Sequence, residues 1–167
     1  MSLKLAFGRD EQLKEPRRPE GRTLVRFYVG DTCYAFDVGA VEEVANPAPL
    51  TTLPDMGTAV AGVTDHRGRV IPVVDLRAKY GVREALGRHT KWVLMRSAYG
   101  LVGFVVDRVL DVVSANGPLS PPPRLGAAVS SRAIVGVVNV EGTLVFILDE
   151  DAEASVIANV DLSAVGG

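Results

Sequence analysis

Three carboxylates stand at the ends of apolar, strand-like segments, where they could do chemistry: Asp75, Asp107 and Asp149. Paired carboxylates can exchange protons with a substrate or hold a metal ion, so one hypothesis is a small β-barrel enzyme that uses these three residues. The alternative is structural, because an aspartate at a strand end accepts hydrogen bonds from the backbone N–H groups that follow. Asp75 and Asp149 occupy matching positions of an internal repeat, which favours strand-end caps. We therefore predict no catalytic site and no enzyme activity.

The other reactive side chains are few and isolated. His66 stands beside the Arg67-Gly68 turn and His89 follows Gly87-Arg88, so both are expected as exposed loop histidines rather than metal ligands. Cys33 is the only cysteine, which excludes an internal disulfide and a cysteine-rich zinc site, and it is expected to pack at a strand start. No P-loop, nucleophile elbow or dinucleotide-binding glycine motif is present. The sequence predicts neither a cofactor nor a metal site.

The elements that must position these residues are short strands. In the segments 24–29 and 34–38 every second residue is apolar and faces one side, and Gly30-Asp31 lies between the segments. This pattern predicts a β-hairpin. Further valine-rich runs of strand length lie at 70–74, 92–95, 101–106, 134–140 and 144–148. Helices are expected to be few. Asp75 should cap a helix over 76–80 that Gly81 ends, and a second helix is expected from Asp149 to about Ala158.

The most informative pattern is an internal repeat. Gly62-Val63, Gly68 and 73–75 return 74 positions later as Gly136-Val137, Gly142 and 147–149. Each copy places a turn, Arg67-Gly68 or Glu141-Gly142, between two apolar strands that end in aspartate. A second correspondence, at an offset of 68, aligns Phe36, Val41, Glu43 and Val44 with Phe104, Val109, Asp111 and Val112. Duplication predicts an all-β fold of two small barrels packed together, because closure protects strand edges and neither barrel alone buries a large core.

Charge and hydropathy exclude other classes of protein. The 167 residues carry a formal net charge of −2 without a clustered basic face, so no nucleic-acid partner is expected. No apolar run approaches the roughly 18 residues of a membrane span, so no direct membrane insertion is predicted. Residues 1–21 are predicted to be a flexible N-terminal tail. The single cysteine fits a reducing, cytoplasmic setting.

Residues 60–77, VAGVTDHRGRVIPVVDLR, resemble the signature of the CheW family, which typically reads GVxNLRGxVIPVVDLR there. Further family landmarks follow in order: Phe27, 34–38, 41–44, Leu53-Pro54, 103–107, 109–112, Pro122-Pro123, 134–137 and 144–149. The resemblance implies two intertwined five-stranded SH3-like β-barrels, with a CheW-like domain over 22–150. A C-terminal segment, 151–167, is expected to be a short helix with a flexible end.

The resemblance also implies a function. Similar proteins are non-catalytic adaptors that bind the regulatory domain of a CheA-like histidine kinase and the cytoplasmic tips of chemoreceptors. Alternatives within the family are a gliding, pilus or gene-regulation pathway, or a member that binds receptors without recruiting a kinase. The partner-binding positions that it implies are Val41, Glu43 and Arg67, with His66 beside them.

Two questions about these positions stay open at the level of sequence. Arg67 either projects from a hairpin tip toward a partner carboxylate or braces its own turn, and Val41 either contacts a partner or packs in a barrel. Gly68, Asp75, Gly142 and Asp149 are interpreted as structural turn and cap residues. Asp65-His66 replaces the family's Asn-Leu, so a titratable group stands beside the implied contact surface, and pH-sensitive binding is a further hypothesis.

Overall fold

Ten short strands carry the fold in the computed structural model, which describes residues 21–122 and 132–158. They are β1 (Arg22–Val29), β2 (Thr32–Asp37), β3 (Val41–Ala45), β4 (Val60–His66), β5 (Arg69–Asp75), β6 (Lys91–Ser97), β7 (Gly100–Val106), β8 (Arg108–Ala115), β9 (Ile134–Val140) and β10 (Thr143–Leu148). Every predicted strand is present. The helical elements are η1 (Val38–Ala40), α2 (Leu76–Lys79), α4 (Glu150–Ala154) and η2 (Ser155–Ile157). Most of the predicted tail and the chain end lie outside the described residues.

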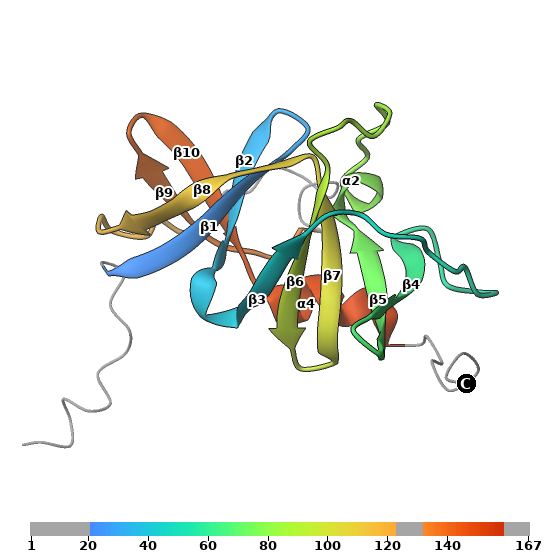
Figure 1. Ribbon diagram of the computed structural model, residues 1–167. Coiled ribbons are helices and arrows are strands. Elements are labelled where there is room, and N and C mark those ends of the chain that lie inside the picture. Colours follow the sequence, from blue (N-terminus) through green and yellow to red (C-terminus); the bar gives the residue numbers. More distant parts are fainter. Residues whose placement is uncertain (1–20, 123–131, 159–167) are drawn as a thin grey trace, which may run out of the picture.

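The strands form two five-stranded sheets, ordered β8-β1-β2-β10-β9 and β3-β6-β7-β5-β4. Each sheet combines strands from both halves of the chain: β1 and β2 join β8 to β10, and β6 and β7 join β3 to β5 (Figure 1). The predicted intertwined, all-β fold is therefore confirmed. Each copy of the repeat contributes to both sheets instead of closing on itself, since β2 and β7 pair in parallel with β10 and β5.

The strand register confirms the duplication. In one parallel pair Val73 lies opposite Gly103, and in the other Ile147 lies opposite Ala35. Val73 and Ile147 are 74 residues apart, whereas Ala35 and Gly103 are 68 apart. The two parallel pairs are therefore equivalent positions of the repeat, with one residue of each pair shifted by 74 and the other by 68. This equivalence relates the two halves by an approximate two-fold axis.

The main core lies between the sheets and draws on both. Phe27, Tyr34 and Phe36 from the first sheet meet Val93 and Phe104 from the second, all at 2% exposure or less. Two smaller clusters fill the individual barrels. Phe36 and Phe104, which are equivalent in the repeat, pack on each other with ring centroids 5.1 Å apart. The shared core explains why the barrels are stable together, since each alone buries little apolar surface.

A segment outside the named strands lies against the outer strand of each sheet, at Thr51 beside β4 and at Ser120 beside β9. We call each of these segments a strap. Thr51 exchanges two backbone hydrogen bonds of 2.8 Å with Val63 on β4, and Ser120 exchanges two of 2.9 Å with Val137 on β9. Gly62 precedes the first bridge and Gly136 the second. A Cβ on Gly62 would lie 2.7 Å from the Thr51 carbonyl oxygen, and one on Gly136 would lie 2.5 Å from the Leu119 side chain. Glycine at both positions therefore allows the close approach of the strap, against backbone at Gly62 and against a side chain at Gly136.

The two short helices begin as predicted. The Asp75 carboxylate accepts hydrogen bonds from the backbone N–H groups of Arg77 and Ala78, and the Asp149 carboxylate accepts one from Asp151. Asp75 and Asp149 are therefore confirmed as caps. The predicted domain ends at residue 150, but α4 and η2 also belong to the fold, because Ala154 and Ile157 lie in the main core.

Candidate functional site

The turn between β4 and β5 carries the exposed Arg67. Arg67 and Gly68 both have positive φ, 54° and 84°, and the Gly68 N–H donates to Asp65 Oδ1 at 2.8 Å. A tight hairpin that twists with its strands needs positive φ at both central positions. The Asp65 carboxylate fixes the turn, so the sequence folds locally into a rigid tip that carries the Arg67 side chain.

Arg67 is both projecting and braced. Its side chain is 72% exposed, yet Nη1 lies 2.9 Å from Glu43 Oε1. Glu43 comes from β3, the strand at the opposite edge of the same sheet from β4, and its own side chain is 27% exposed. The two alternatives left open by the sequence therefore combine: an internal carboxylate holds one side of the guanidinium while the rest faces solvent.

His66 lies beneath this pair, and the prediction of an exposed loop histidine is wrong for it. It is the last residue of β4 and its side chain is only 19% exposed. Its Nε2 atom lies 3.4 Å from Glu43 Oε1, the oxygen that also faces Arg67. The strand keeps the ring against the sheet edge. His89, by contrast, is exposed as predicted.

Val41 does not join the cluster of Glu43, His66 and Arg67. It is half-buried and packs against the main core, opposite Met95 of β6. This geometry supports a packing role in the second sheet for Val41, while its implied role in partner contact stays a prediction. Val44, further along β3, is 41% exposed and offers the apolar surface there.

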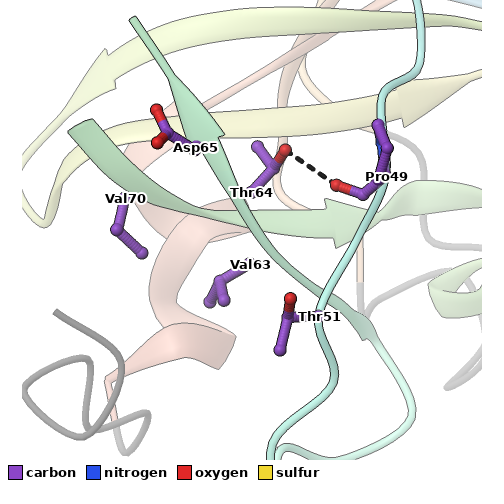
Figure 2. A pocket seen from close by; sticks show the side chains of 6 residues that line it. All are labelled: Pro49, Thr51, Val63, Thr64, Asp65 and Val70. Atoms are coloured by element: carbon purple, nitrogen blue, oxygen red, sulfur yellow. Dashed lines mark hydrogen bonds between the residues drawn. The ribbon is translucent and has the colours of Figure 1, made fainter. Parts of the chain in front are cut away.

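An open depression lies beside the turn, and sequence reasoning missed it. It has a volume of about 380 Å³ and is lined by Pro49, Thr51, Val63, Thr64, Asp65 and Val70 (Figure 2). Thr64 Oγ1 donates to the Pro49 carbonyl oxygen at 2.9 Å, which holds the strap against β4. Asp65 is the only ionisable residue in the lining, and one of its carboxylate oxygens is engaged by the turn. Such walls suit contact with another chain better than acid–base chemistry.

The three aspartates considered as an enzyme site serve separate purposes. Asp75 and Asp149 cap helices. Asp107 accepts from the Gly30 N–H at 2.6 Å and pairs with the buried Arg77, which ties the β1–β2 turn to α2. Within the described residues, the one cluster of three acidic groups is Asp149, Glu150 and Asp151 at the start of α4. The convergence that the enzyme hypothesis requires of Asp75, Asp107 and Asp149 is not seen.

Asp111 is the residue equivalent to Glu43 in the repeat, and its carboxylate binds an arginine in a different environment. Asp111 on β8 pairs with Arg26 of β1, Nη2 to Oδ2 at 2.7 Å, and the Arg26 side chain is only 10% exposed. The hydrogen bond from Arg26 lowers the pKa of Asp111. Here the acid holds an arginine inside the fold, whereas Glu43 holds one at the surface.

The fold thus consists of two five-stranded sheets that share strands from both halves of the chain, with the exposed Arg67 held by Glu43 at one tip. A family profile described as CheW-like domain matches residues 23–156. Chemotaxis protein CheW of Rhizobium meliloti is 30% identical over 79% of this chain and 86% of that protein. Protein FrzA of Myxococcus xanthus is 33% identical over 80% of this chain and 83% of its own.

A solved structure shares this fold. The scaffolding protein TtCheW from Thermoanaerobacter tengcongensis superposes with a TM-score of 0.73 at 21% identity, covering 80% of this chain and 92% of that one. The chain belongs to the CheW family, whose role is chemotaxis signal coupling. Over the described residues, no helix has the length and apolar character needed to cross a membrane.

Proposed function

We propose that this chain couples the cytoplasmic tips of chemoreceptors to the regulatory domain of a CheA-like histidine kinase, and that it does so by binding alone. Membership in the family of chemotaxis scaffolds supports the coupling role. Its place of action is then the cytoplasm, at receptor arrays on the membrane. A fluorescent fusion should gather where the receptors gather and disperse in a strain that lacks them.

The single observation that carries the proposal is the preorganised Arg67 guanidinium. The turn fixes its backbone, Glu43 holds one edge, and 72% of the side chain remains exposed. A planar guanidinium with free donors suits bidentate contact with a partner carboxylate. Because the turn already fixes the backbone that carries Arg67, less conformational entropy is lost when the partner binds.

Calorimetric titration of the intact chain with the kinase regulatory domain, and separately with a receptor tip, tests the proposal. Arg67→Ala should weaken one of the two interactions by about 2 kcal/mol, roughly 30-fold, if Arg67 is central to that interface. Glu141→Ala is the matched control, since Glu141 occupies the equivalent turn of the other barrel. Equal affinity of Arg67→Ala and wild type for both partners would refute the role of Arg67.

Val41 requires a different reading of the same titration. Val41→Ala removes core contacts, so a loss of binding counts only if its urea unfolding curve matches that of the wild type. Val44→Ala alters the exposed face of β3 without touching the buried clusters. Weaker binding by Val44→Ala with unchanged stability would extend the contact surface along β3.

The pathway served is a separate question. FrzA is as similar to this chain as are proteins named chemotaxis protein CheW, so identity does not choose between flagellar taxis and another chemosensory pathway. If the chain binds the receptor tip but does not bind the kinase domain, it is a family member that does not recruit kinase. The neighbouring genes would show which kinase to test first.

A further inference from the structure

His66 carries a buried polar atom that the coupling role leaves unexplained. Its Nε2 is shielded from solvent and makes no hydrogen bond to any part of the chain that the structure describes. The Glu43 Oε1 atom is 3.4 Å away, too far and too poorly aligned for a good hydrogen bond. A buried nitrogen without a hydrogen-bond partner carries a desolvation cost, which a hydrogen bond to Glu43 would remove.

The charged groups around the ring come from three sides. Glu43 faces it from β3, Arg67 follows it in the turn, and Arg69 of β5 lies opposite it in the strand register. Asp65 precedes it, and one oxygen of that carboxylate accepts the Gly68 N–H at 2.8 Å. Glu43 is the carboxylate that lies within ion-pair distance of His66 Nε2, and it is the acceptor that Arg67 already uses.

We propose that His66 is a positioning residue for Arg67: its protonation draws Glu43 onto the imidazolium, loosens the Glu43–Arg67 pair and frees the guanidinium for a carboxylate on the partner. This rests on the proposed function only for the identity of the partner.

The direction of the effect follows from charge. An imidazolium N–H forms a charge-assisted hydrogen bond to a carboxylate at about 2.8 Å, so Glu43 Oε1 would move toward His66. Two cations then share one carboxylate, and the repulsion between them weakens the outer pair. The tip gains one positive charge, which strengthens attraction to an acidic partner. Binding should therefore be tighter at pH 6 than at pH 8.

The first test needs no partner. In an NMR titration of the full chain from pH 8 to 5.5, the Glu43 side-chain carboxyl carbon and the Arg67 Nε–Hε resonances should shift with the same midpoint as the His66 ring. In His66→Gln, which keeps a polar group but cannot titrate, both resonances should stay constant. His89 is the internal control, because its titration should move neither resonance. If the Glu43 and Arg67 signals stay constant while His66 titrates in the wild type, the proposal is overturned.

The second test adds the kinase regulatory domain or the receptor tip, whichever partner Arg67→Ala weakens. Wild type should bind about threefold more tightly at pH 6 than at pH 8, the worth of one exposed ion pair. His66→Leu, which restores the apolar residue of the family pattern, and His66→Gln should lose that dependence. A pH dependence that persists in both variants would contradict the proposal. Absence of binding at either pH would instead refute the proposed coupling function and leave the NMR result to decide the role of His66.

Discussion

The two halves of the chain share a backbone plan but not their charges. The turn residues Arg67 and Glu141 have almost the same φ, 54° and 51°, and each following glycine N–H donates to a side chain three residues earlier at 2.8 Å. Yet one tip carries a cation and the other an anion. Positions that fix the backbone were kept in both copies, while positions that face outward diverged.

The same divergence appears at the approximate two-fold axis. Lys79 of α2 and Glu153 of α4 are 74 residues apart, so they are equivalent, and they pair with each other, Nζ to Oε1 at 2.5 Å. Glu153 is fully buried and also accepts hydrogen bonds from the Tyr80 hydroxyl and the Ala133 N–H. Identical residues here would place like charges in contact. A duplicated fold must therefore break its sequence symmetry where equivalent positions meet.

Restoring that symmetry should have the largest effect. Lys79→Glu places two carboxylates in a site that excludes water, and we expect a loss of about 3 kcal/mol at pH 7. The loss should shrink at pH 5, because one carboxyl group takes up a proton and relieves the repulsion. Urea unfolding at the two pH values measures this. Lys79→Met, which only removes the cation, is the control. If Lys79→Glu is as stable as the wild type at pH 7, the pairing of Lys79 with Glu153 is contradicted.

The repeated glycines under the straps should differ in sensitivity. Gly62→Ala forces a Cβ against the Thr51 carbonyl oxygen, which is fixed by the Thr51–Val63 bridge, at a φ of 150°. We expect a loss of about 2 kcal/mol. Gly136→Ala meets the Leu119 side chain, which can move, so its loss should be about 1 kcal/mol. Thermal unfolding of the two variants measures both losses. A larger loss for Gly136→Ala than for Gly62→Ala would contradict the prediction.

The two helix caps should also be unequal. Asp75→Ala removes an acceptor of two backbone N–H groups and should cost about 1 kcal/mol. Asp149→Ala should cost about half as much, because it relieves repulsion at the start of α4. There the pKa of Glu150 is raised by burial and, to a lesser degree, by Asp149 and Asp151. Urea titration at pH 7 measures both, and equal losses would rule out that relief.

The pair of Asp111 and Arg26 should show its own pH dependence. The pKa of Asp111 is lowered in the folded chain by the hydrogen bond from Arg26, so its contribution is present above about pH 4 and lost as the pH falls further. Asp111→Asn should cost less than 1 kcal/mol at pH 7, since this carboxylate is 42% exposed. The difference from wild type should shrink as the pH falls below about 4. A difference that is constant with pH would assign the effect to packing.

The smallest effect concerns the turns themselves. Asparagine tolerates the left-handed conformation better than glutamate or arginine, so Glu141→Asn should stabilise the chain by about 0.5 kcal/mol. Arg67→Asn should gain less, because it also loses the pair with Glu43. Only Arg67→Asn should weaken partner binding in the calorimeter. If Glu141→Asn weakens binding equally, the two tips share the contact surface and the contrast between them fails.

The sequence by itself determined the local features and the duplication. Strand alternation, the two helix caps and the two turns depend on a few neighbouring residues, so Gly68, Asp75, Gly142 and Asp149 could be assigned from their types and spacing. The two offsets, 74 and 68, relate the pair of Val73 and Gly103 to the pair of Ile147 and Ala35, although the pairing itself is seen only in the structure. Such signals are readable because each copy repeats them independently.

Only the tertiary structure decided which charges meet. Because strands from both halves of the chain form each sheet, Arg26 meets Asp111, 85 residues away, and Lys79 meets Glu153, 74 residues away. The fold also places His66 against Glu43 of the opposite sheet edge, which the turn beside it did not suggest. An ion pair leaves no periodic trace along a chain, because its partners are set by the path of the backbone through space. The braced arginine at the tip is therefore a property of the fold.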